Sequence, residues 1–156
     1  MVQLHLIVHG SKMAIEFSSK SATYSELSNF QVAPFILKDT TWPTVEHYFQ
    51  AQKFPGDSLL QERIRLATSP ASAKKLGRTR TPFFRSDWED VKEDVMLEGL
   101  RAKFTQNAEL GQLLKSTGGM QLKEKAFWDA YWGTGRTGKG KNRMGVLLER
   151  VRAEII

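Results

Sequence analysis

Apolar residues recur along the chain with spacings that change between those of strands and those of helices. Short apolar runs bounded by turn residues predict strands at residues 15–17, 34–38 and 121–124. Apolar residues at helical spacing predict six helices. Three of them are predicted over residues 58–67, 107–114 and 144–156, and a fourth runs from Ser69-Pro70 to Gly77. The other two start at Pro43 and at the capping box Ser86–Glu89. The glycine-rich segment 133–141 is expected to be a loop. The pattern predicts a compact, helix-rich α+β fold with a few short strands and no βαβ alternation.

The length of 156 residues is typical of one domain. Met13 offers a second plausible start, and the segment before it lacks the basic beginning and the small-residue cleavage site of a secretory signal. We therefore expect residues 1–12 to be a leader or extended start outside the fold, and residues 13–156 to form a single domain.

Composition narrows the class of protein further. With 40% hydrophobic and 10% aromatic residues, the chain can bury a core, which excludes disorder of the whole. No apolar run approaches the roughly 18 residues of a membrane span. Cysteine is absent, which excludes disulfides and thiolate chemistry and fits a reducing compartment. We expect a cytoplasmic protein without a membrane partner.

The charge balance favours anionic ligands. There are 23 Lys and Arg residues against 17 Asp and Glu, which gives a formal net charge of +6. Phosphorylated metabolites, nucleotides and nucleic acids are the partners that such a chain attracts. Acidic residues interrupt most of the basic runs, so the pattern favours a compact anion pocket over the continuous basic stripe of a nucleic-acid binder.

One candidate site lies in the helix predicted from Pro43. Glu46, Gln50 and Lys53 are spaced i, i+4 and i+7 and therefore share a helix face beside the apolar stripe. This spacing could hold a carboxylate, an amide and an ammonium together at the rim of the core. The alternative interpretation is an ordinary solvated face. The scattered histidines do not form a metal site, and we expect neither a metal nor a cofactor.

A second candidate site is the glycine-rich loop, which follows a group of aromatic residues. Glycines such as Gly133 let backbone N–H groups approach an anion, and Lys139 adds charge. The helix that begins at Asn142 adds a favourable dipole, while Trp132 could stack on a heterocycle. The alternative is a flexible basic surface loop.

Two weaker signals pair an aromatic residue with polar neighbours. Asn29 and Phe30 lie in a polar loop, where asparagine is most often a turn residue. Trp88 lies on the apolar stripe of its helix, so a place in the core competes with a stacking role.

Together these segments resemble the NADAR superfamily, and more narrowly the YbiA-type N-glycosidases. The resemblance is carried, in order, by SNF, PFILKDTTWPTVEHYFQAQKF, IRLATSPASAKKLGR, LRAKFTQNAEL and DAYWGTGRTGKGKNRMGVLLERVR, from about Ile15 to Arg152. It implies a small α+β fold. It also implies hydrolysis of the N-glycosidic bond in phosphorylated ribosylamino intermediates of riboflavin biosynthesis, which releases ribose 5-phosphate and the base. The implied partner is a small phosphorylated N-ribosyl substrate.

The resemblance also implies site residues. The family's glutamate and lysine fall on Glu46 and Lys53, its aspartate and tryptophan on Asp129 and Trp132, and its asparagine on Asn142. We expect Glu46, Asp129 and Lys53 to be catalytic. The expected substrate-binding residues are Asn29, Phe30, Trp88, Trp132, Gly133, Lys139 and Asn142.

The chemistry of the reaction agrees with this assignment. Cleavage of an N-glycosidic bond develops positive charge on C1 of the ribose, which a carboxylate stabilises. Glu46 and Asp129 could share this task with proton transfer to the base and orientation of the water. Lys53 could instead attack C1 and hold the opened sugar as an imine. The basic glycine loop would hold the 5′-phosphate.

Two alternative functions remain open from the sequence. Other branches of the superfamily act on ADP-ribosyl groups, so the chain could remove ADP-ribose from guanine in nucleic acid. A nucleic-acid-binding module is the third hypothesis, because basic and aromatic residues together suit phosphate contacts and base stacking.

Overall fold

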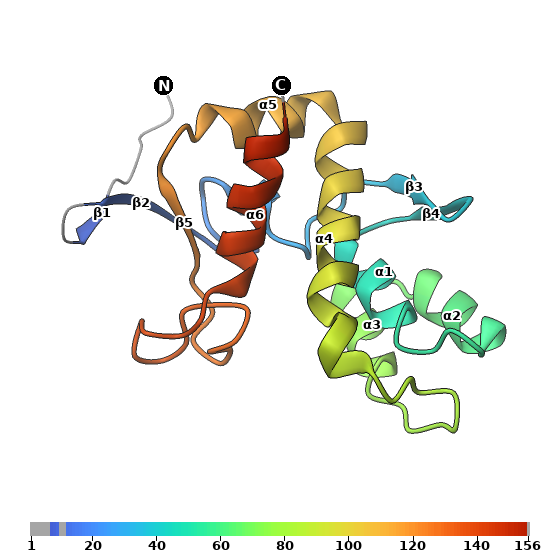
Figure 1. Ribbon diagram of the computed structural model, residues 1–156. Helices are drawn as coiled ribbons and strands as arrows, with labels where there is room; N and C mark the ends of the chain where they lie inside the picture. The colour runs from blue at the N-terminus through green and yellow to red at the C-terminus, as the bar shows by residue number, and fades with distance from the viewer. Residues whose placement is uncertain (1–6, 10–11, 156) are drawn as a thin grey trace. The chain divides into compact units, whose positions relative to one another are not determined.

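The computed structural model describes residues 7–9 and 12–155, with side chains from 13 to 155. The chain divides into two compact units (Figure 1). One unit joins the segment up to Gln31 with the segment from Asn107 onward, and the other is Val32–Gln106. None of the helices among the described residues is long and apolar enough to cross a membrane.

The first unit is built on a three-stranded sheet in the order β1-β2-β5. β1 (Ile7–His9) is antiparallel to β2 (Lys12–Phe17), and β2 is parallel to β5 (Gln121–Glu124). A 3₁₀ turn (Ser25–Leu27) and the helices α5 (Ala108–Ser116) and α6 (Arg143–Glu154) complete this unit.

Helix α6 packs directly on β5 (Figure 1). A Cβ atom at Gly145 would lie 1.9 Å from the carbonyl oxygen of Leu122, so only glycine permits this close approach. Near the other end of α6, Arg152 donates to Thr117 Oγ1 and to the carbonyl oxygen of Met120 at 2.9 and 2.7 Å. These contacts fix the helix on the sheet. The buried apolar side chains of this unit include Ala14, Ile15, Phe17, Leu122, Met144, Leu147, Leu148 and Val151.

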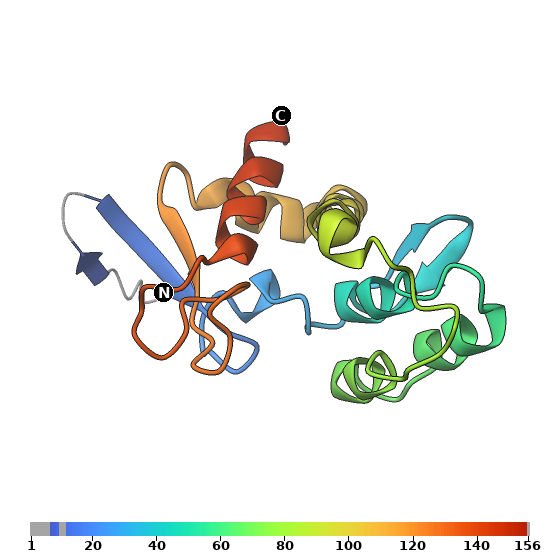
Figure 2. The same ribbon diagram turned by 60° about the horizontal axis from the view of Figure 1, so that its bottom comes forward.

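The second unit combines a hairpin with four helices. The strands β3 (Phe35–Leu37) and β4 (Thr40–Trp42) are antiparallel and are joined by a two-residue turn with positive φ angles. The helices are α1 (Val45–Ala51), α2 (Ser58–Arg65), α3 (Pro70–Leu76) and α4 (Trp88–Gln106). All seven residues of α1 are buried, because α1 lies between α3 and α4 and also contacts α2 (Figure 2).

The structure confirms the predicted elements and corrects some of their boundaries. Thr44 is the N-cap of α1, so Pro43 precedes this helix instead of forming its first turn. α1 ends at Ala51, which places Lys53 beyond the helix. The capping box predicted at Ser86–Glu89 does not match the start of α4, because this helix begins at Trp88 and Asp87, not Ser86, precedes its first residue.

The prediction that residues 1–12 are a leader stays a prediction. Most of this segment lies outside the described residues, although the backbone of β1 pairs with β2.

A buried histidine fixes the start of α1. The backbone N–H of His47 donates to Thr44 Oγ1 at 3.1 Å, and His47 Nδ1 lies 2.7 Å from the same hydroxyl oxygen. His47 Nε2 lies 3.0 Å from the carbonyl oxygen of Ala67, which can only accept. Nε2 therefore carries the proton, and Nδ1 accepts from Thr44. Burial lowers the pKa of His47, and the hydrogen bond to Ala67 opposes this shift.

This burial predicts that acid weakens the fold through His47. Because the native pKa lies below the unfolded value of about 6.5, the unfolded state takes up the proton first. The free energy of unfolding should be unaffected by this group above that pH. Below it, the free energy should fall by up to about 1.4 kcal/mol per pH unit. Urea denaturation between pH 7.5 and 5 measures this slope. A His47→Gln variant should have a shallower slope, and equal slopes for the two proteins would contradict the prediction.

Candidate functional site

A buried carboxylate and amide form the centre of the candidate site in the second unit. Glu46 is 4% and Gln50 is 3% exposed, and Gln50 Nε2 donates to Glu46 Oε1 at 2.7 Å. The i, i+4 spacing therefore brings the two side chains together as predicted, but the alternative of a solvated face is wrong. Glu46 lies in the first turn of α1, where the helix dipole favours a negative charge.

Gly77 makes room for the Gln50 amide. A Cβ atom at position 77 would lie 1.9 Å from Gln50 Oε1 and 2.7 Å from its Cδ. The same oxygen is buried without a hydrogen-bond donor among the described residues. The amide is therefore held by its bond to Glu46 and by its fit against the end of α3.

Lys53 lies beside this pair. Its Nζ donates to the carbonyl oxygen of Gly77 at 3.5 Å and lies 6.0 and 5.7 Å from the ring centroids of Phe49 and Trp88. Burial lowers the pKa of the Lys53 amine, while the charge of Glu46 opposes that shift. The positive charges of three other side chains lower it further, namely Arg80, Arg78 and Lys74.

Trp88 packs inside the second unit. Its side chain is 6% exposed, and its ring lies 4.9 Å from that of Phe49 at an interplanar angle of 59°. This environment agrees with a place in the core. A stacking contact between Trp88 and a substrate base stays a prediction.

In the first unit, Asp129 closes the turn that leads into the glycine loop. Its Oδ1 accepts the backbone N–H groups of Tyr131 and Trp132, each at 2.9 Å. The rings of Tyr131 and Trp132 meet edge to face at 5.0 Å. Asp129 therefore has a structural task in addition to the catalytic one that we expect of it.

The glycine loop does not present its backbone as the sequence suggested. Every backbone N–H group from Gly138 to Met144 donates within the unit, mostly to carbonyl oxygens of residues 130–135. The donors at the start of α6 are included, because Arg143 and Met144 bond to Tyr131 and Trp132. These N–H groups are therefore not available to an anion. For the stretch from Gly138 to the start of α6, that premise of the prediction is wrong.

Asn142 and Gly133 serve the packing of this loop. Asn142 Nδ2 donates to the carbonyl oxygen of Leu122 at 2.8 Å, and its Oδ1 accepts from the N–H of Glu124 at 2.9 Å. A Cβ atom at Gly133 would lie 2.7 Å from that of Ala126. Both residues hold the loop against β5, and substrate contact by either one stays a prediction.

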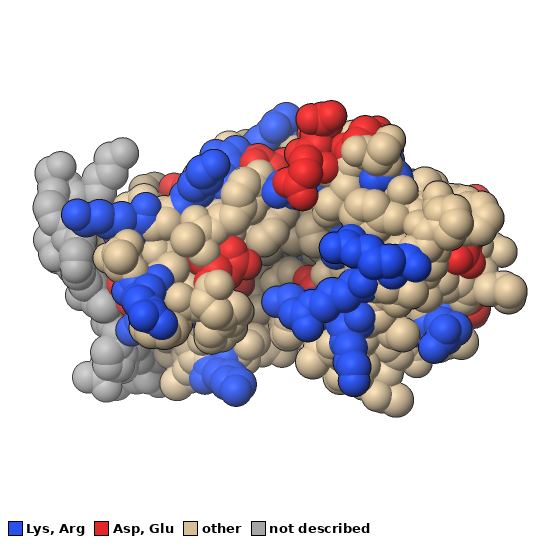
Figure 3. Space-filling view, turned by 90° about the horizontal axis from the view of Figure 1, so that it is seen from below, with Lys and Arg blue, Asp and Glu red and all other residues tan. Residues whose placement is uncertain are grey.

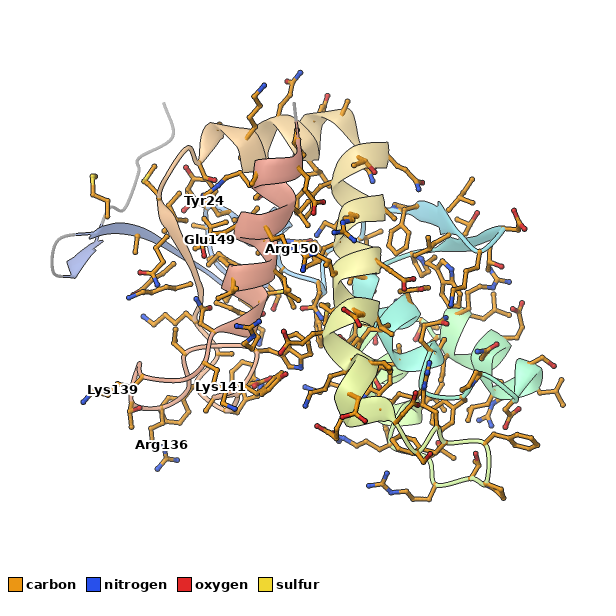
Figure 4. All side chains as sticks on the ribbon, in the orientation of Figure 1. Tyr24, Arg136, Lys139, Lys141, Glu149 and Arg150 are labelled. Atoms are coloured by element: carbon orange, nitrogen blue, oxygen red, sulfur yellow. The ribbon has the colours of Figure 1, made fainter. Side chains whose placement is uncertain are left out.

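The charged side chains of the loop face solvent. Arg136 and Lys139 are exposed and extend away from it (Figure 4). Arg136 lies 4.9 Å from the ring of Phe127, and Lys141 lies 5.4 Å from that of Tyr131. Side chains are therefore what this loop can offer to an anion.

Asn29 and Phe30 follow the 3₁₀ turn of the first unit. Asn29 is 7% exposed, and the N–H of Phe30 donates to Ser28 Oγ at 3.2 Å. Their predicted contact with substrate stays a prediction.

Sequence reasoning missed two features of the second unit. It treated Gly77 only as a helix stop, and it did not single out Arg78 and Arg80. The sequence KKLGRTR does carry a signal, since its basic residues follow the helix end directly, but their proximity to Lys53 depends on the packing of α3 against α1.

The sequence model of the NADAR domain matches residues 16–156. The chain belongs to the NADAR family. It is 50% identical to the N-glycosidase YbiA of Escherichia coli (strain K12) over 90% of this chain and 88% of that protein. It is also 40% identical to a riboflavin biosynthesis protein of Vibrio vulnificus (strain YJ016), over 90% of this chain and 38% of that longer protein.

A solved structure supports the same family assignment. The NMR structure of the E. coli protein YbiA superposes with a TM-score of 0.82 at 48% identity, covering 94% of this NADAR chain and 86% of the other. This likeness confirms the resemblance stated from the sequence and the helix-rich α+β fold with a few short strands.

The fit of Gln50 against Gly77 predicts that Gly77→Ala destabilises the second unit. The added methyl group has to displace the buried amide, and overpacking of this kind costs about 1–3 kcal/mol. Urea denaturation measures the loss. Gly119→Ala is the matched control, because a Cβ atom there has nothing within 4 Å.

The source of the clash can be checked in the same assay. In a Gln50→Ala background, Gly77→Ala should cost much less, because the group that it strikes is gone. An equal cost in both backgrounds would show that the clash is not with Gln50.

Proposed function

We propose that this NADAR protein is an N-glycosidase of phosphorylated ribosylamino intermediates of riboflavin biosynthesis. It hydrolyses the bond between the base and C1 of the ribose, and it releases ribose 5-phosphate and the free base. The observation that carries the proposal is the buried Glu46, held by Gln50 beside Lys53. The names of its relatives, N-glycosidase and riboflavin biosynthesis protein, support the reaction and the substrate class.

Glu46 suits the developing charge of this reaction. As the glycosidic bond breaks, C1 and the ring oxygen become positive, and a fixed carboxylate stabilises that state more than it stabilises the neutral substrate. Gln50 fixes the carboxylate with its hydrogen bond. Burial strengthens the electrostatic interaction, because little water screens it.

Lys53 has two candidate roles beside Glu46. As an ammonium it would hold the carboxylate in its charged form. As an amine it would attack C1 and break the bond to the base, which leaves with a proton. The ribose ring would then open to an imine, and water would hydrolyse the imine to release ribose 5-phosphate. The lowered pKa of Lys53 favours the neutral, nucleophilic form. Asp129 is the second proposed catalytic carboxylate, for proton transfer to the base or orientation of the water.

The proposed substrate contacts come from the sequence analysis. Trp132 would stack on the base, and Asn29, Phe30 and Lys139 would contact the substrate. A small phosphorylated substrate of this kind is compatible with a cytoplasmic enzyme that needs no cofactor.

The reaction can be tested with a Glu46→Gln variant. The substituted amide still presents an oxygen to Gln50, so the fold should be unchanged. Turnover should fall by about 10²–10⁴-fold, because the charge that stabilises C1 is lost. The measurement is release of ribose 5-phosphate and free base from the riboflavin intermediates. Glu62→Gln, at an exposed surface pair, is the control and should keep wild-type turnover.

The same assay separates the alternative functions. It is run in parallel with ADP-ribosylated guanine, and DNA retention is measured at two salt concentrations. Release of ADP-ribose without cleavage of the riboflavin intermediates would favour the ADP-ribose-directed hydrolase. Salt-sensitive DNA retention without any cleavage would favour the binding module. Wild-type turnover by Glu46→Gln would remove Glu46 from the chemistry.

The role of Asp129 is tested by comparing two substitutions. Asp129→Asn keeps an oxygen that can accept the N–H groups of Tyr131 and Trp132, whereas Asp129→Ala removes both bonds. If Asp129 is catalytic, both variants lose turnover, and only the alanine variant loses about 1–2 kcal/mol of stability. Wild-type turnover by Asp129→Asn would restrict this residue to forming the turn.

A further inference from the structure

The segment from Gly77 to Arg85 is attached to Lys53 at both of its ends. The carbonyl oxygen of Gly77 accepts from Lys53 Nζ at 3.5 Å, and the N–H of Arg85 donates to the carbonyl oxygen of Lys53 at 2.9 Å. The backbone of this segment is therefore tied to Lys53 within the same unit.

This segment is strongly basic and carries uncompensated charge. Arg85 is paired with Asp87, whereas Arg78 and Arg80 form no ion pair with a carboxylate in the part of the chain that the structure describes. Both guanidinium groups are exposed to solvent. Figure 3 shows Lys and Arg side chains gathered over α3 and the segment that follows it.

Two observations place these charges near the candidate site and restrict their motion. Arg78 and Arg80 belong to the segment anchored on Lys53, and their positive charges, with that of Lys74, lower the pKa of the Lys53 amine. The Arg80 guanidinium lies 5.6 Å from the ring of Phe84, and that ring packs at 5.8 Å on the buried Phe54. Stacking on a fixed ring orients a guanidinium before any ligand arrives.

Guanidinium groups without a carboxylate partner in the described chain, on a segment anchored at Lys53, suit a phosphate group of a ligand. A guanidinium fork matches the oxygens of a phosphate, and each of its bonds to a phosphate is charge-assisted. A ribosyl 5′-phosphate carries its phosphate at the far end of the sugar from C1. A substrate with C1 at Glu46 therefore needs cations one sugar's length away.

We propose that Arg78 and Arg80 bind the 5′-phosphate of the ribosyl substrate and so determine the preference for phosphorylated over unphosphorylated ribosides. This subsite rests on the proposed N-glycosidase function. It differs from the sequence-based expectation that the glycine loop holds the phosphate, because the N–H groups of that loop from Gly138 to Met144 are already used.

The test compares the wild-type protein with Arg78→Gln/Arg80→Gln. kcat/KM is measured for a phosphorylated ribosylamino substrate and for its dephosphorylated counterpart. The double variant should lose at least about tenfold in kcat/KM on the phosphorylated substrate, mainly through KM, and should lose much less on the other. Arg63→Gln, an exposed arginine of α2, is the matched control and should change neither value.

A variant of the glycine loop tests whether the loop holds the phosphate instead. If Arg136→Gln/Lys139→Gln abolishes the preference for the phosphorylated substrate while Arg78→Gln/Arg80→Gln retains it, the phosphate is held by the loop and the proposal is overturned.

A binding measurement separates this proposal from the proposed reaction. Calorimetry with ribose 5-phosphate should detect binding to the wild-type protein, and binding should weaken at least about tenfold in Arg78→Gln/Arg80→Gln. Unphosphorylated ribose is the control ligand. Suppose that the wild-type protein binds ribose 5-phosphate but cleaves no riboflavin intermediate, and that Arg78→Gln/Arg80→Gln loses this binding. That result would refute the reaction and support the subsite. Equal binding of ribose 5-phosphate by both proteins would refute the subsite.

Discussion

The candidate site depends on the burial of a charged residue in a helix that has no solvated face. Glu46 is nearly inaccessible within α1, and an unpaired carboxylate in such a place would cost several kcal/mol. The start of α1, the Gln50 amide and the nearby Lys53 each offset part of that cost. A helix that needed only to be stable would be better served by an apolar side chain at this position, so the charge is more simply explained by chemistry than by packing.

The position of that charge is related to α3 and the segment after it through a close contact at Gly77. Gly77 is small enough to accept the Gln50 amide, and its carbonyl oxygen receives the Lys53 amine. The same residue therefore ends α3, orients Gln50 and begins the segment that carries Arg78 and Arg80. The positions of the proposed catalytic group and of the proposed phosphate subsite are thus coupled through the local geometry of one glycine.

The sequence predicted the features that depend on local spacing, but it did not predict those that depend on contacts between distant segments. Helical periodicity located α2, α3, α4 and α6, and the i, i+4 rule paired Glu46 with Gln50. The sequence could not show that α1 is buried on all sides, because this burial results from the packing of α3 and α4 against it. The glycine loop was interpreted from its composition as a backbone anion cradle. Its N–H groups from Gly140 to Met144 donate instead to carbonyl oxygens of residues 130–134, a pairing that no spacing rule reveals.

In the second unit, opposing charges act on the pKa of Lys53. A phosphate bound at the proposed subsite would change their balance. Glu46 raises the pKa of the amine, while Arg78, Arg80 and burial lower it. A phosphate dianion bound by the two arginines would cancel their effect and move the pKa of Lys53 upward. A bound phosphorylated substrate would then favour the ammonium form of Lys53 more than the protein without substrate does. Phosphate recognition and the protonation of Lys53 are therefore linked, because both depend on the same few charges around one buried carboxylate.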